Sequence, residues 1–183
     1  VSKVCESLSL AGFEIFLIGR LLDSSTRLDK NYKVHRFSLI FNKGFLFYAE
    51  YNFRLFIRLL FERADVYHSN DLDTLLPMWI ISNFKKKPIV YDSHEYFTGV
   101  GEIQSRPMVK YIWKTIEKNI FPHLNHVFTV NQSIADLYFK EYNILPKIIR
   151  NLPTSSKIEK IKSKSDLGLP SDKWIIILQG AGI

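Results

Sequence analysis

Hydrophobic positions in the first third of the chain follow two rhythms, which predict two kinds of element. Apolar residues recur at spacings of three and four before Gly12, so this segment predicts an amphipathic helix that ends at the glycine. The apolar run at residues 13–18 and the alternation at residues 32–37 each predict a strand. Residues 45–61 form a longer aromatic pattern with helical spacing.

From residue 64 onward, short apolar runs alternate with longer amphipathic segments. This alternation predicts strands linked by helices, and right-handed crossovers then make the sheet parallel. The predicted strands are 64–68, 88–92, 126–130 and 147–150, and the predicted helices are 72–84, 107–120 and 133–142. We therefore expect an α/β, Rossmann-like fold in which helices cover both faces of one doubly wound parallel sheet.

The pattern also divides the chain into three parts. Residues 1–150 predict one α/β domain, and the polar, lysine-rich stretch 151–166 predicts an interdomain linker. Residues 167–183 contain a buried-strand pattern that is followed at once by Gly180 and Gly182. Because a Rossmann-like domain begins with a strand and a glycine turn, we expect these residues to open a second, truncated domain.

Composition places the chain among folded globular proteins. Of its 183 residues, 46% are hydrophobic and 23% are charged, which excludes disorder of the whole chain. Cys5 is the single cysteine, so the chain has no internal disulfide framework, and a reducing compartment fits best. The first ten residues lack the pattern of a secretory signal peptide, and we expect a cytoplasmic protein.

The net charge of +7 favours anionic partners such as phosphorylated small molecules. The lysines cluster at 85–87 and within 157–164, and neither cluster is interleaved with aromatic residues as in a nucleic-acid groove. We therefore do not expect nucleic acid as a partner. The apolar segment 45–61 contains Glu50, Arg54 and Arg58 and cannot span a bilayer. It predicts a core helix or, alternatively, an interfacial helix that gives peripheral association with the cytoplasmic membrane face.

Candidate binding residues follow from the rule that ligands lie beyond the carboxyl ends of parallel strands. Polar residues stand at the end of each predicted strand from residue 64 onward, and we expect them to contact substrate. They are Asn70 and Asp71, then Asp92, Ser93, His94 and Glu95, then Asn131 and Ser133, and finally Asn151.

His94 is the candidate catalytic residue, because an imidazole can exchange a proton or hydrogen-bond a sugar hydroxyl or a phosphate. Asp92 and Glu95 are placed to orient it and to raise its pKa. The glycine-containing loop 96–101 could cover a bound ligand. The alternative for Ser93 and His94 is that they only satisfy backbone groups.

Other polar residues have structural alternatives. Asp71 either binds ligand or, like Asp73, complements the dipole at a helix start, and Asn131 and Ser133 fit helix caps. His68 fits a hydrogen-bonded core histidine. No cluster has the spacing of metal ligands, since Asp71 and Asp73 begin a helix rather than end a strand, and we expect no metal.

Several segments, in this order, resemble glycosyltransferase family 4. The segments are Val1 to Ile15, Ala64 to Asp71, Tyr91 to Phe97 around His94, Val127 to Ala135, Ile148 to Pro153, and Leu178 to Gly182. The resemblance covers nearly the whole chain. It implies the N-terminal, acceptor-side half of a GT-B fold, in which two Rossmann-like domains face a cleft.

The resemblance also implies an activity. Members transfer a sugar with retention from a UDP- or GDP-sugar to an acceptor, here a glycan or a lipid-linked glycan in polysaccharide or cell-envelope biosynthesis. The nucleotide sugar is a co-substrate, and neither metal nor another cofactor is implied. His94 would lie beside the reacting sugar or its diphosphate, and Gly180 and Gly182 would belong to the donor side.

Two departures from the family pattern matter. The family's first strand and its glycine loop would precede Val1, and without them a central position in the sheet stays empty. The groups that bind the nucleotide would lie in the other domain, so this fragment alone is not expected to catalyse transfer. Competing interpretations are a GT-B sugar-nucleotide epimerase, a non-catalytic sugar- or phosphate-binding module, and an NAD-dependent enzyme that begins at Gly180.

Overall fold

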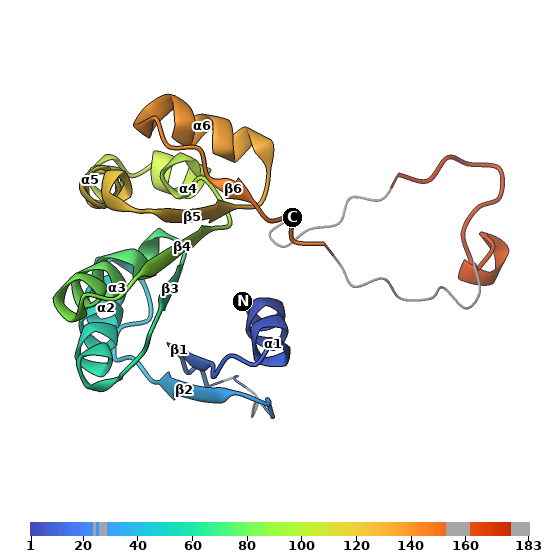
Figure 1. The fold of residues 1–183 in the computed structure, drawn as a ribbon. Coiled ribbons are helices and arrows are strands. Elements are labelled where there is room, and N and C mark those ends of the chain that lie inside the picture. Colours follow the sequence, from blue (N-terminus) through green and yellow to red (C-terminus); the bar gives the residue numbers. More distant parts are fainter. Residues whose placement is uncertain (24, 26–28, 153–161, 177–183) are drawn as a thin grey trace. The chain divides into compact units, whose positions relative to one another are not determined.

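A computed structural model describes residues 1–23, 25, 29–152 and 162–176 (Figure 1). The chain divides into two compact units, Val1–Asn151 and Leu152–Ile183. The first unit contains every described β-strand and all the longer helices.

The first unit begins with a small parallel sheet. Helix α1 (Ser2–Leu10) is followed by Gly12, whose φ of 92° explains why the helix stops at a glycine. Strands β1 (Phe16–Arg20) and β2 (Lys33–Phe37) then pair in parallel. The sequence predicted β2 well and placed β1 a few residues too early.

A second parallel sheet has four strands in the order β3-β4-β5-β6. These strands are β3 (Tyr67–Asn70), β4 (Ile89–Ser93), β5 (His126–Thr129) and β6 (Lys147–Ile148). Asn70 is in register with Asp92, and Ser93 with Thr129. The carboxyl ends of β3, β4 and β5 therefore meet at one edge of the sheet.

Helices connect these strands as the alternating pattern predicted. The longer ones are α2 (Gly44–Phe61), α3 (Leu72–Lys85), α5 (Pro107–Ile120) and α6 (Gln132–Tyr142). The short ones are η1 (Phe97–Gly99), α4 (Gly101–Gln104) and η2 (Phe121–His123). Figure 1 shows α2 and α3 beside β3, and α4, α5 and α6 around β4, β5 and β6.

One correction concerns the sheet. The predicted α/β class with parallel strands and covering helices is confirmed, but the strands form two sheets rather than one. No described strand pairs with both β1 and β3. Helix α2 bridges the two sheets, because the Tyr51 ring lies 5.6 Å from Phe37 of β2 and Leu55 is buried in the main core.

The core under α5 and α6 is aromatic. Phe121 is fully buried, and its ring stacks 4.5 Å from Tyr138 and 4.6 Å from Tyr142, measured between centroids. Tyr91 of β4 meets the edge of the same ring. This stack fixes α6 against β4, the strand that carries the residues around His94.

In the second unit, the structure describes Leu152 and residues 162–176. It contains the turn η3 (Ser165–Leu167), which Gly168 ends with a φ of 66°. The strand predicted within residues 167–183 does not form at Trp174–Ile176, where Trp174 is fully exposed and the backbone has no regular structure. A strand requires a neighbouring backbone to pair with, and none of the described residues provides one. Gly180 and Gly182 lie outside the described residues.

Candidate functional site

Two histidines and two aspartates gather where β3 and β4 end. His68 belongs to β3, Asp71 follows it, Asp92 belongs to β4, and His94 follows that strand. All four side chains are partly exposed, with 13–32% of each side chain accessible. The parallel register of β3 and β4 brings together residues that are more than twenty positions apart in sequence.

His94 is held from both sides by carboxylates. Its ring Nε2 lies 3.1 Å from Asp92 Oδ2, and its backbone N–H donates to Asp71 Oδ1 at 2.8 Å. The other ring nitrogen, Nδ1, lies 3.7 Å from Asp71 Oδ2, which is too far for a hydrogen bond. Nδ1 is therefore the ring atom in position to bind a ligand.

Asp92 connects the two histidines. Its Oδ2 atom lies 3.7 Å from His68 Nε2, a buried atom with no hydrogen-bond partner among the described residues. Burial alone would raise the pKa of Asp92, but the nearby imidazoles of His68 and His94 outweigh burial and lower it. An ionised Asp92 can only accept hydrogen bonds, so His94 Nε2 is the donor, and in a neutral ring Nδ1 carries the free lone pair.

Asp71 has an unusual backbone conformation. Its φ of 58° and ψ of 171° lie in a region that side chains other than glycine rarely adopt. The conformation is held by the hydrogen bond from Asp71 N to Asp92 O at 2.9 Å and by the bond from His94 N to its carboxylate. Burial raises the pKa of Asp71 despite these contacts with His94. Strain of this kind occurs where a side chain must be aimed at a particular point.

Asp73 belongs to the same acidic group, although the sequence favoured a purely helix-terminal role. Burial, followed by the charge of Asp71, raises the pKa of Asp73 from 3.8 to about 6. Burial and the Asp71 charge also raise the pKa of Glu95, whose side chain is more exposed. The carboxyl ends of β3 and β4 thus form a region in which added negative charge is disfavoured.

The raised pKa of Asp73 predicts a change of stability with pH. Its folded-state pKa of about 6 exceeds the ordinary value of 3.8, so the folded state binds the proton more tightly. The contribution of Asp73 to the free energy of unfolding should therefore fall as the pH rises from 3.8 to about 6. Above that pH the contribution should stay constant. Asp73→Asn should remove that fall and raise the free energy of unfolding at neutral pH by about 1–3 kcal/mol.

Urea unfolding at several pH values measures this effect. Asp172→Asn changes an exposed carboxylate in the second unit and serves as the control, because it should leave the pH profile unchanged. Parallel profiles for wild type and Asp73→Asn would show that Asp73 is not titrating in this window.

Other predicted residues support the site rather than line it. Ser93 is fully buried, and its hydroxyl bonds Tyr138 OH at 2.9 Å and Glu95 O at 2.8 Å. The hydroxyl is therefore not exposed to substrate, contrary to the expectation from its place at a strand end. Thr74 Oγ1 donates to the Asn70 backbone oxygen at 2.8 Å and ties β3 to the start of α3.

The predicted residues beyond β5 and β6 stay apart from the cluster. Asn131 caps α6, with its Oδ1 accepting from Ile134 N at 2.9 Å, as the alternative reading expected. Ser133 and Asn151 are exposed. Among the described residues, no contact joins Asn131, Ser133 or Asn151 to His94.

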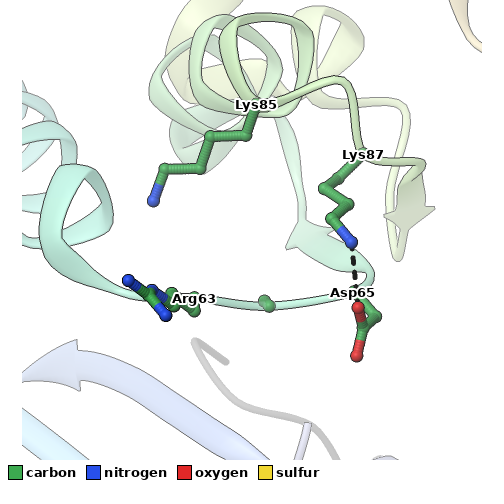
Figure 2. A pocket seen from close by; sticks show the side chains of 5 residues that line it. Arg63, Asp65, Lys85 and Lys87 are labelled. Atoms are coloured by element: carbon green, nitrogen blue, oxygen red, sulfur yellow. Dashed lines mark hydrogen bonds and ion pairs between the residues drawn. The ribbon is translucent and has the colours of Figure 1, made fainter.

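A cavity of about 280 Å³ lies at the opposite edge of the sheet, where β3 and β4 begin (Figure 2). Lys85 Nζ donates to Leu59 O at 2.8 Å and also to Glu62 O, the carbonyls at the end of α2. Lys87 pairs with Asp65 at 2.9 Å. Lys85 thus complements the carbonyl end of α2 and Lys87 an exposed carboxylate, so the lysines beside the cavity have a structural explanation.

Two features are absent from the described residues. Within that part of the chain, no group of three or more His, Cys, Asp or Glu side chains is arranged to hold a metal ion. No helix in the same residues is both long and apolar enough to cross a membrane.

Comparison with known proteins points to one family. A family model described as Glycosyltransferase Family 4 matches residues 1–154, which include every residue of the cluster around His94. No curated protein matches the chain.

Proposed function

Because this chain belongs to glycosyltransferase family 4, we propose that it is the acceptor-side half of a retaining enzyme that uses a UDP- or GDP-sugar. Family membership supports glycosyl transfer as the general activity. The cluster of Asp71, Asp92 and His94 at the carboxyl ends of β3 and β4 supports the assignment of this activity to particular residues. Ligands of open parallel sheets bind at that edge.

In this proposal His94 acts through Nδ1. Asp92 accepts the proton of Nε2 and so fixes the ring and its tautomer. Nδ1 then accepts a hydrogen bond from a sugar hydroxyl or, once protonated, donates one to a diphosphate oxygen. Both interactions position the reactants, and the second also stabilises the charge that develops on the leaving group.

The carboxylates limit where the diphosphate can lie. Asp71, Asp73 and Glu95 surround the backbone next to His94, and burial already raises their pKa values. A diphosphate placed directly against them would add repulsion. We therefore place the acceptor hydroxyls near Asp71 and Glu95, which accept hydrogen bonds from neutral sugars, and the diphosphate out of direct contact with these carboxylates.

The test uses the full-length protein with a panel of UDP- and GDP-sugars, and measures release of the nucleoside diphosphate and the configuration of the transferred sugar. Diphosphate release with retained configuration is expected. Absence of release with every donor would overturn the enzyme proposal and favour a sugar- or phosphate-binding module. Conversion of the donor to its epimer would favour the epimerase alternative.

Peripheral association with the cytoplasmic membrane face belongs to the same proposal. Helix α2 exposes Phe53, Ile57 and Phe61 along one side, at a spacing of four residues. Arg54 and Arg58 next to this side are paired with Glu50 and Glu62, so the apolar side chains rather than these arginines would drive binding. Sedimentation with vesicles of neutral lipid is therefore expected, and no sedimentation with neutral or anionic vesicles would remove the membrane from the proposal.

A further inference from the structure

A partly buried charge cluster joins the segment after His94 to helices α5 and α6. Lys114 Nζ lies 2.6 Å from Glu117 Oε2 and 2.6 Å from Glu141 Oε1. The Glu117 side chain is completely buried, with 0% of it exposed. The cluster lies outside the group of His68, Asp71, Asp92 and His94, and the proposed chemistry does not use it.

Two residues of the segment after His94 bind this cluster. Tyr96 OH donates to Glu141 Oε2 at 2.6 Å, and Thr98 Oγ1, itself buried, donates to Glu117 Oε2 at 3.3 Å. Lys114 reaches the same two hydroxyls, at 3.3 Å for Tyr96 and 3.4 Å for Thr98. The segment expected to be a loop that could cover a ligand is therefore anchored at both hydroxyls.

Close packing strengthens the anchor. A Cβ added at Gly99 would lie 2.3 Å from Cδ1 of the Tyr96 ring, so the chain needs glycine to turn back against that ring. The turn is closed by Gly99 N, which donates to Tyr96 O at 2.7 Å. The Tyr96 ring meets the edge of Tyr138 of α6. Only a few arrangements of this segment satisfy these contacts together.

The cluster does more than hold the helices together. Burying Glu117 beside Lys114 costs desolvation, and well-packed apolar side chains would join α5 to α6 at least as tightly. The Oε1 atom of Glu117 is buried without a hydrogen-bond partner, which adds to that cost. Apolar replacements could not bind the hydroxyls of Tyr96 and Thr98. Glu117 Oε2 also accepts from Tyr142 OH of α6 at 2.7 Å, so the charges both join α5 to α6 and fix the position of the segment.

That segment begins next to the candidate catalytic residue. One residue separates His94 from Tyr96, and Ser93 on the other side is bonded to Tyr138 of α6. We infer that Lys114, Glu117 and Glu141 are positioning residues that hold the backbone after β4, so that His94 and Glu95 face the substrate. The catalytic part of this inference rests on the proposed function, whereas the anchoring of the segment does not.

The experiment compares two variants of the full-length protein. Lys114→Met removes the cation, and the double variant Lys114→Met/Glu117→Met replaces the buried ion pair with apolar side chains of similar length. Lys118→Met, one helical turn further along α5 at an exposed position, is the matched control. Hydrogen exchange of residues 96–104, the free energy of unfolding, and kcat and KM are measured for each.

Lys114→Met should accelerate exchange at residues 96–104 by about tenfold or more and lower kcat by about tenfold, with the donor KM changed less than twofold. The double variant should recover the unfolding free energy of wild type but keep the fast exchange and low kcat. Lys118→Met should match wild type in all four measurements.

Two results would overturn the inference. One is wild-type exchange at residues 96–104 in Lys114→Met, and the other is recovery of slow exchange in the double variant along with stability. If no sugar nucleotide serves as donor, the proposed function fails, but the exchange comparison still decides whether the charges fix the segment. Faster exchange with unchanged kcat would support the anchoring of the segment and contradict its effect on catalysis.

Discussion

Replacing His94 by alanine in the full-length protein should lower kcat by about 10²–10³-fold while the fold is retained. The side chain is partly exposed and its backbone N–H contact to Asp71 does not depend on the ring. The loss should therefore appear in catalysis and not in stability. Diphosphate release under saturating donor measures kcat, and circular dichroism measures the fold.

His126→Ala provides the matched control. His126 starts β5, so it lies at the opposite edge of the same sheet from His94, and it is exposed. Its replacement should leave kcat within about twofold of wild type. Near-normal transfer by His94→Ala would remove this residue from the chemistry, even if the enzyme proposal stands.

The second large effect concerns the aromatic stack. Phe121→Ala should lower the free energy of unfolding by about 3–5 kcal/mol, because it leaves a cavity in a tightly packed core. The ring is fully buried and stacks on Tyr138 and Tyr142, and it meets the edge of Tyr91. A loss of this size is a large part of the stability of a typical domain. Urea unfolding followed by fluorescence gives the measurement.

Tyr111→Ala removes another aromatic side chain, from α5, and is the control because 73% of that residue is exposed. It should change the free energy of unfolding by about 0.5 kcal/mol or less. Equal losses for the two variants would mean that the stack around Phe121 contributes no more than a surface contact.

Helices were predicted more accurately than strands. Helix α5 has the predicted bounds, Pro107–Ile120, because helical spacing and an initial proline are local signals. Strand β3 was predicted at residues 64–68 but occupies Tyr67–Asn70. It begins where Tyr67 N can donate to Pro88 O, and that register depends on a strand about twenty residues away. The local hydrophobic pattern does not specify that pairing.

The sequence predicted that several candidate residues would lie together at one edge of the sheet. The strand-end rule selected Asp71, Asp92 and His94, which the structure brings together. It could not separate them from Ser93, because burial of the Ser93 hydroxyl depends on Tyr138, which is 45 residues away. Strand-end position identifies the edge of the sheet, whereas tertiary contacts decide which side chains face outward.

Three residues, two in the site and one that holds the segment after His94, were missed or assigned a smaller role. His68 was interpreted as a core histidine, but its buried Nε2 faces Asp92 without a hydrogen bond. Asp73 was assigned to the helix dipole, and burial gives it a raised pKa as well. No role was predicted for Glu117, which lies within an amphipathic helix pattern. A charged residue at an inward position of α5 was the one available signal.

The strained backbone of Asp71 has a consequence for protein engineering. Glycine would adopt its φ of 58° and ψ of 171° without the cost of a side chain, so a screen for heat resistance alone would favour Asp71→Gly. The same change would delete the carboxylate that accepts from His94 N. If Asp71 binds the acceptor as proposed, thermostability and turnover compete at this one position, and a library selected for both should retain the aspartate.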